Sequence, residues 1–187
     1  MVKRNSCVFI SGKGSNLKNL IIKSRDSSFP INIKLVISND PNAYGLKYAK
    51  QFSIPYYIID TKSEKYENFL LVKLKEYKIS IICLAGFMKI ISKKFIKNFN
   101  KKIINIHPSL LPKFKGLNTY SRILKNREKI SGCTVHYVNE KLDNGRIICN
   151  KKFSIEDTDD QKTLKIKTQK LEHFAFPQAL IRVFNKN

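Results

Sequence analysis

The sequence predicts an α/β fold: a doubly wound, mostly parallel sheet with helices on both faces. Short β-branched runs alternate with longer segments in which apolar residues recur at helical spacing. Several of the short runs, such as residues 79–85, are apolar almost without interruption, which is typical of parallel strands covered on both faces. The length of 187 residues and the 42% apolar content suit one domain over residues 1–187, with right-handed crossovers.

Strand and helix patterns alternate along the first half of the chain. An apolar run at residues 6–10 leads into a glycine-rich loop, and Leu17, Leu20 and Ile21 then follow at helical spacing. Turn residues and prolines divide the segments that come next. The predicted elements are strand 34–38, helix 43–52, strand 54–59, helix 63–77 and strand 79–85.

The second half continues the alternation and then turns to strands that adjoin in sequence. Pro108 and Pro112 prevent a strand at 103–106 from continuing. The predicted elements are helix 87–99, strand 103–106, helix 119–125, strands 132–138 and 147–153, and a final helix at 160–184.

The formal charge of +22 raises the possibility of a nucleic-acid-binding protein. It comes from thirty lysines and six arginines against fourteen acidic residues, spread along the whole chain. Arginine is the residue of bidentate phosphate and base recognition, so we expect no dedicated nucleic-acid site. Anionic small substrates would still be attracted. An inactive basic protein that binds nucleic acid remains the alternative of a different class, and it predicts steeply salt-dependent binding.

The cysteines and the apolar runs indicate a cellular location. Cys7, Cys83, Cys133 and Cys149 have no C-x-x-C spacing, and buried reduced thiols are expected. No apolar run reaches transmembrane length, and the start at Met1 lacks the hydrophobic region of a signal peptide. We therefore expect a cytoplasmic protein with no membrane contact and no metal.

The loop from Gly12 to Asn16 has the composition of a phosphate-binding turn. Its glycines let backbone amides approach an anion, and the helix that follows directs its partial positive end there. The spacing completes neither the Walker loop nor the dinucleotide fingerprint, so a monophosphate is favoured over a pyrophosphate. The alternative is a plain turn into a helix.

Three polar residues are candidates for catalysis. Asn105 and His107 alternate onto one side at the carboxyl end of a strand, where open α/β sheets bind their ligands. Asp143 lies in a turn sequence between two strands, and its carboxylate could orient His107, keep it protonated and raise its pKa above about 6.5. The alternatives are a hydrogen-bonded core histidine, a turn asparagine and an Asx turn.

Four motifs, at residues 10–17, 84–91, 105–112 and 142–145, together resemble phosphoribosylglycinamide formyltransferase, a folate-dependent family of purine biosynthesis. The resemblance extends from about Ser6 to Phe184. It implies transfer of a formyl group from 10-formyltetrahydrofolate, a co-substrate, to the amine of glycinamide ribonucleotide through a tetrahedral intermediate. Preorganised hydrogen-bond donors stabilise such an oxyanion.

The resemblance also implies roles for individual residues. Asn105 would donate to the formyl oxygen, His107 would stabilise the oxyanion and act as an acid, and Asp143 would keep His107 charged. The substrate phosphate would lie at Gly14, Ser15 and Asn16, and the sugar and glycinamide at Gln169 and Glu172, for which a solvated helix face is the alternative. The folate pocket would be lined by Phe87, Met88, Lys89, Ile90 and Ile91, with Asn105 beside them.

Some residues depart from the family pattern. Lys89 replaces a usual arginine, Ser63 falls near a family arginine that contacts the folate, and we expect weaker folate affinity. The other departures are Asn144-Gly145-Arg146 after Asp143, Asn118 and Tyr120 in place of histidines, and a short C-terminus after Phe184.

Two other formyl-handling enzymes are close alternatives. Formyltetrahydrofolate hydrolase and methionyl-tRNA formyltransferase are similar around the asparagine, histidine and aspartate positions. Each carries an additional domain for which we expect no room in this chain. The sequence is compatible with a monomer or a homodimer.

Overall fold

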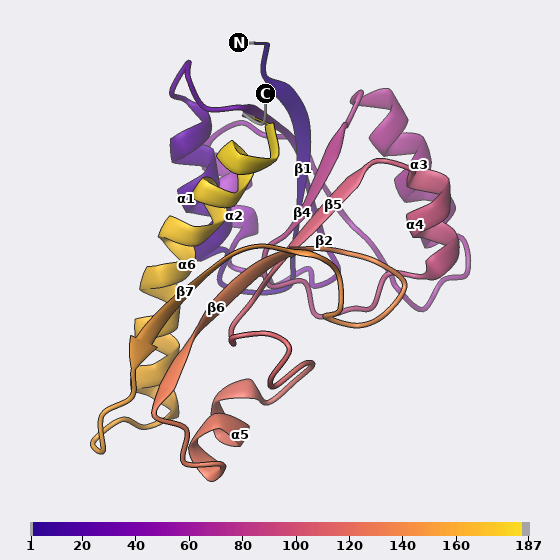
Figure 1. The fold of residues 1–187 in the computed structure, drawn as a ribbon. Helices are drawn as coiled ribbons and strands as arrows, with labels where there is room; N and C mark the ends of the chain where they lie inside the picture. Colours follow the sequence, from indigo (N-terminus) through magenta and orange to yellow (C-terminus); the bar gives the residue numbers. More distant parts are fainter. Residues whose placement is uncertain (1, 185–187) are drawn as a thin grey trace. The chain divides into compact units, whose positions relative to one another are not determined.

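The computed structural model describes residues 2–184 and contains seven strands and six helices (Figure 1). The strands are β1 (Arg4–Ile10), β2 (Ile31–Ser38), β3 (Tyr56–Ile58), β4 (Ile81–Leu84), β5 (Lys102–His107), β6 (Ile130–Tyr137) and β7 (Ile147–Ser154). The helices are α1 (Ser15–Ser24), α2 (Leu46–Gln51), α3 (Tyr66–Glu76), α4 (Lys93–Phe99), α5 (Thr119–Lys125) and α6 (Gln161–Phe184). The strand order is β3-β2-β1-β4-β5-β6-β7, which confirms the predicted α/β class.

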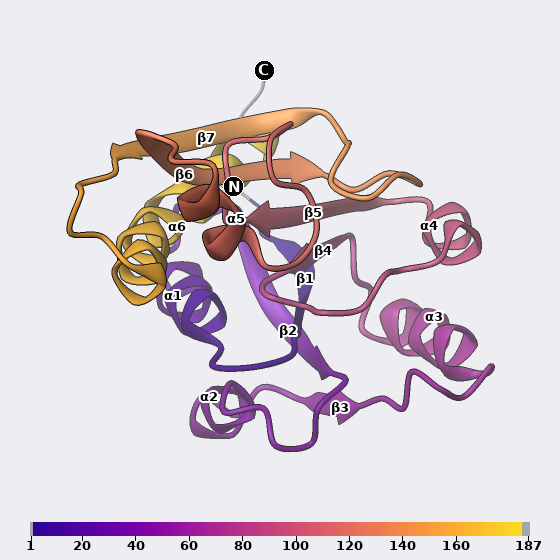
Figure 2. The same cartoon turned by 90° about the horizontal axis from the view of Figure 1, so that it is seen from below.

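The chain divides into two compact units, Met1–Ile104 and Asn105–Asn187, with the boundary inside β5. In the first unit, β1 pairs in parallel with both β2 and β4, and β2 pairs in parallel with β3. Helices α1 and α2 lie on one face of these strands and α3 and α4 on the other (Figure 2). Because both faces are covered, β4 and the end of β1 are buried, as the unbroken apolar runs predicted.

In the second unit, β6 and β7 form an antiparallel pair against which α6 packs. Gly132 is required in β6 because a Cβ there would lie 1.9 Å from the carbonyl oxygen of Lys151. Helix α6 begins at a reciprocal cap, since the Asp160 carboxylate accepts from the Thr163 amide at 2.7 Å and the Thr163 hydroxyl accepts from the Asp160 amide at 2.7 Å. This cap explains why the helix starts where the sequence predicted.

The predicted helix at 87–99 is wrong in its first part. Gly86 has a φ of +77°, and the backbone from residue 87 to residue 92 is not helical. The hydroxyl of Ser92 accepts the amide hydrogen of Phe95 at 3.0 Å, so α4 begins only at Lys93. The apolar residues of the segment 87–91 suit helical spacing, but the cap at Ser92 and the turn at Gly86 exclude them from the helix.

The four cysteines, Cys7, Cys83, Cys133 and Cys149, are buried and free, as predicted. Burial raises the pKa of each thiol. Among residues 2–184, no group of three or more histidine, cysteine or acidic side chains is arranged to hold a metal ion. No helix within these residues is both long enough and apolar enough to cross a membrane.

Candidate functional site

Two of the three candidate catalytic residues lie at the carboxyl end of β5. His107 is the last residue of the strand and is only 6% exposed. The chain then turns back, and Phe114, with a φ of +57°, places its carbonyl oxygen 2.9 Å from Nε2 of His107. A carbonyl oxygen can only accept, so this contact is a hydrogen bond when Nε2 carries the hydrogen.

Asp143 joins this pair from the loop between β6 and β7. One carboxylate oxygen accepts the Gly116 amide hydrogen at 2.8 Å and lies 3.3 Å from Nδ1 of His107. The other accepts from the Asn105 side-chain amide at 3.4 Å. The second unit therefore brings Asp143 to Asn105 and His107, from which it is far away in sequence.

The replacement of a usual Gly-Gly-Pro by Asn144-Gly145-Arg146 leaves the Asp143 side chain directed at His107. A Cβ on Gly145 would lie 1.7 Å from the carbonyl oxygen of Tyr137, so the turn requires glycine there. The Tyr137 amide donates to the Arg146 carbonyl at 2.9 Å. These contacts fix the turn, and Asp143 takes a positive φ of 45° within it.

His136 is a member of this cluster that the sequence analysis missed. It is 2% exposed at the end of β6, and its Nε2 lies 3.2 Å from the Asn105 amide nitrogen and 3.6 Å from Asp143. Nδ1 lies 2.8 Å from the Tyr137 carbonyl, so a hydrogen on Nδ1 leaves Nε2 to accept from Asn105. The available signal was a histidine at the carboxyl end of a strand, which is also what marked His107.

Both ring nitrogens of His107 face oxygen atoms that only accept hydrogen bonds, a pattern that matches the doubly protonated ring. Burial nevertheless lowers the pKa of His107 below its ordinary value, and the Phe114 carbonyl and Asp143 only partly offset that effect. The prediction of a pKa raised above about 6.5 is therefore wrong. Desolvation of the ring outweighs the nearby carboxylate.

The surroundings of Asp143 favour its ionised form. Burial opposes its charge, but contacts from His136, the Gly116 amide and His107 outweigh burial and lower the pKa of Asp143. The cluster thus favours a negative charge on Asp143 and disfavours a positive charge on the neighbouring His107 ring. A further negative charge forming beside His107 would favour protonation of its ring.

In the first unit, the glycine loop makes a tight turn into α1. Gly14 takes a φ of +70° at the start of α1, and a Cβ there would lie 2.4 Å from Cα of Gly45. The Gly45 amide donates to the Gly12 carbonyl at 2.9 Å, which fixes the loop against the start of α2. Ser15 and Asn16 form the first turn of α1, which contains no acidic residue. The partial positive end of α1 is therefore not neutralised by an acidic residue of its own first turn.

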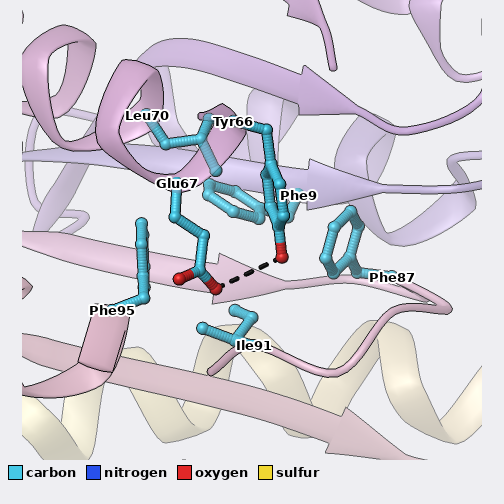
Figure 3. A pocket seen from close by; sticks show the side chains of 7 residues that line it. All are labelled: Phe9, Tyr66, Glu67, Leu70, Phe87, Ile91 and Phe95. Carbon is cyan, nitrogen blue, oxygen red and sulfur yellow. Dashed lines mark hydrogen bonds between the residues drawn. The ribbon is translucent and has the colours of Figure 1, made fainter. Parts of the chain in front are cut away.

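The segment expected to line the folate pocket forms an exposed turn in the same unit. Met88 is 61% and Ile90 75% exposed, and Lys89 is also exposed. Phe87 instead turns inward and meets the ring of Phe9 edge to face at 5.3 Å. Beneath the segment is a small pocket, shown in Figure 3, lined by Phe9, Tyr66, Glu67, Leu70, Phe87, Ile91 and Phe95.

Gln169 and Glu172 lie in α6, in the second unit, three residues apart and half-buried. Tyr120, in α5, has a raised pKa, first because it is buried and second because of the charge of Glu172. Glu172 therefore faces Tyr120, which stands where the family often has a histidine. Asn118, the other such position, has a φ of +55° at the start of α5.

Comparison with known proteins decides the family. The formyl transferase family model matches residues 4–180. The phosphoribosylglycinamide formyltransferase of Haemophilus influenzae is 40% identical over 91% of this chain and 82% of its own length. The chain belongs to the phosphoribosylglycinamide formyltransferases. This confirms the resemblance inferred from the four motifs, and the matched names favour none of the alternatives weighed from the sequence.

Other relatives support the same family, and one of them is a much longer protein. The trifunctional purine biosynthetic protein adenosine-3 of Drosophila melanogaster is 43% identical over 98% of this chain, which spans only 14% of that protein. Crystal structures of phosphoribosylglycinamide formyltransferase from Bacillus halodurans and Brucella melitensis match with TM-scores of 0.92 at 34% and 38% identity. They cover 98% and 100% of this chain, which covers 96% and 97% of theirs.

Proposed function

We propose that this chain transfers a formyl group from 10-formyltetrahydrofolate to the amine of glycinamide ribonucleotide, in purine biosynthesis. The observation that carries the proposal is the position of His107, between the Asp143 carboxylate and the Phe114 carbonyl, in a member of this family. A buried imidazole with an acceptor at each nitrogen is suited to gaining a proton when negative charge develops next to it. Acyl transfer to an amine requires such a group.

In the proposed reaction the substrate amine attacks the formyl carbon and a C–N bond forms. The carbonyl electrons move to oxygen, giving a tetrahedral intermediate with an oxyanion. The bond from carbon to N10 of the folate then breaks, N10 gains a proton and the amine has lost one. His107 takes up the amine proton, and its imidazolium form stabilises the oxyanion and returns a proton to N10 through Nε2, which exchanges its contact with the Phe114 carbonyl for the substrate.

The charges around His107 support this sequence. Burial keeps the ring neutral at rest, so it can act as a base, while Asp143 and Phe114 already accept from the positions that both hydrogens of the imidazolium would occupy. The oxyanion offsets the cost of burying the ring's positive charge. The stabilisation is therefore greater in the transition state than in the resting site. Asn105 would donate a side-chain N–H to the oxyanion. To do so, it would give up its contact with His136 or with Asp143.

Substrate binding is proposed at the remaining positions. Gly14, Ser15 and Asn16 would hold the phosphate, and Gln169 and Glu172 the sugar and glycinamide. The folate would bind to the segment formed by Phe87, Met88, Lys89, Ile90 and Ile91, and to Asn105. Because Lys89 presents a point charge rather than a planar fork, and Ser63 offers no cation, folate affinity would be weaker than with arginine at both positions.

A formyl-transfer assay on the purified protein tests the proposal. 10-Formyltetrahydrofolate is incubated with and without glycinamide ribonucleotide, with the wild type and with His107→Ala. Transfer that requires the ribonucleotide and falls by at least about 100-fold in the variant supports the assignment. Deformylation without the acceptor would indicate the hydrolase reaction instead, and absence of both reactions would overturn the proposal.

We further propose that residues 1–187 act as one domain in the cytoplasm, as a monomer or a homodimer, with no metal and no nucleic-acid partner. Four buried, reduced thiols favour that compartment. A single cooperative unfolding transition would support one domain, whereas two separate transitions would contradict it. Sedimentation analysis would distinguish monomer from homodimer.

A further inference from the structure

Ser11 links three loops of the first unit through one hydroxyl group. It follows β1 and directly precedes the glycine loop. Its oxygen accepts the Met88 amide hydrogen at 2.8 Å, and its own hydrogen is donated to the side-chain oxygen of Asn39. The hydroxyl therefore uses both its donor and an acceptor lone pair, one for each neighbouring loop.

The sheet makes this link short and direct. Strands β2, β1 and β4 are adjacent, with Ile10 in register with Ser38 and Phe9 in register with Leu84. The loops that leave their carboxyl ends therefore start side by side. Through Ser11, the loop that carries Gly14 is joined to the segment that carries Met88.

The far end of the 87–91 segment has a separate anchor on α3. The Glu67 carboxylate accepts the Ser92 amide at 3.0 Å and the Ser92 hydroxyl at 2.5 Å. It also accepts the Tyr66 hydroxyl at 3.2 Å, the contact drawn in Figure 3. This anchor touches the segment but not the glycine loop.

We propose that Ser11 is a positioning residue that couples the glycine loop to the 87–91 segment, so that each substrate strengthens the binding of the other. The inference rests on the proposed function, in which the loop holds the substrate phosphate and the segment holds the folate. A ligand that orders the loop fixes Ser11, and Ser11 then holds the Met88 backbone in place for the second ligand. The second ligand binds to a segment that is already ordered, so it loses less conformational entropy. Coupling of this kind must be equal in both directions.

The test measures binding in a His107→Ala background, where transfer is blocked. Calorimetry gives the Kd of glycinamide ribonucleotide with and without 10-formyltetrahydrofolate. It also gives the Kd of 10-formyltetrahydrofolate with and without the ribonucleotide. For either ligand, the Kd without the other ligand divided by the Kd with it is the coupling factor. We expect Ser11→Ala to lower the coupling factor about threefold to tenfold, which corresponds to the loss of the hydrogen bond between Ser11 and the Met88 amide. Ser11→Thr retains the hydroxyl and should restore the coupling.

Glu67→Gln serves as the matched control. It weakens the anchor on α3, so folate binding should weaken to the same degree with and without ribonucleotide, while the coupling factor stays at the wild-type value. A merely structural role for Ser11 would weaken both binary complexes and leave the ratio unchanged.

The inference is overturned if Ser11→Ala leaves the coupling factor unchanged while its urea midpoint matches that of the His107→Ala background. It is also overturned if the His107→Ala background itself shows no coupling. Those results leave transfer by the wild type untouched, so they are distinct from a failure of the proposed function. That failure would appear as no ribonucleotide-dependent transfer by the wild type.

Discussion

Replacing Asp143 by asparagine removes the negative charge beside His107 and preserves the size of the side chain. The carboxylate lies 3.3 Å from Nδ1 of His107 and accepts the Gly116 amide at 2.8 Å. An asparagine oxygen can still accept from Gly116, so the turn should hold. What is lost is the stabilisation of the imidazolium when it forms.

The size of that loss can be estimated from the separation. Two unit charges separated by 3.3 Å attract by roughly 5 kcal/mol at an effective dielectric constant of about 20. The amide dipole that remains and the relaxation of the site reduce this to about 2–4 kcal/mol of transition-state stabilisation. At about 1.4 kcal/mol per tenfold, turnover should fall by roughly 30-fold to 1000-fold.

The assay compares kcat with the Kd of glycinamide ribonucleotide measured by calorimetry. We expect kcat to fall by the factor above and the Kd to change by less than about threefold, because the charge acts on the reacting centre. Asp159→Asn is the matched control. That residue is half-buried, and its carboxylate lies 2.6 Å from Lys167 but does not contact His107. Equal losses in kcat and ribonucleotide affinity for Asp143→Asn, or the same loss of kcat in Asp159→Asn, would refute the electrostatic role.

Three further predictions follow from the loops and the buried histidine. Ser15→Asp should weaken ribonucleotide binding by about tenfold or more, because the new carboxylate repels the phosphate, and it should leave the folate Kd unchanged. An equal loss of folate binding would show that the loop is no phosphate site. Gly145→Ala should lower the free energy of unfolding by about 1–3 kcal/mol in urea titrations, whereas Gly12→Ala, with no atom within 4 Å of the added methyl, should change it by less than about 0.5 kcal/mol. Because the folded-state pKa of His107 is lowered, the unfolded chain binds more protons and stability should fall as pH drops through about 6.5. His107→Gln should reduce the slope of the free energy of unfolding against pH by up to about 1.4 kcal/mol per pH unit. If the slope between pH 5.5 and 7.5 were the same in the variant and the wild type, that would contradict a buried neutral ring.

The order of elements could be predicted because it depends on local patterns. Helix α5 was predicted at its observed bounds, and most other elements within a few residues. Helix α4 was an exception, since its start depends on the cap at Ser92. A segment of apolar residues at helical spacing gave no sign that it would remain outside the helix.

The cluster of Asn105, His107, Asp143 and His136 was predicted in part. Asn105 and His107 could be paired from the period-two alternation along one strand, and Asp143 by the resemblance. His136 could not be paired with them, because its proximity depends on how β6 lies beside the end of β5. The effect of burial on the pKa of His107 was likewise invisible, since it depends on which chain segments exclude water from the ring.

The sequence by itself determined the alternation of strands and helices, the glycine loop and the identity of the family, because periodicity and short motifs are properties of neighbouring residues. Only the tertiary structure decided that His107 meets Asp143 and the Phe114 carbonyl while burial keeps the ring neutral, and that Ser11 joins two loops that are far apart in sequence. Desolvation and hydrogen bonds between distant segments depend on the packing of the whole unit, and no local pattern encodes that packing.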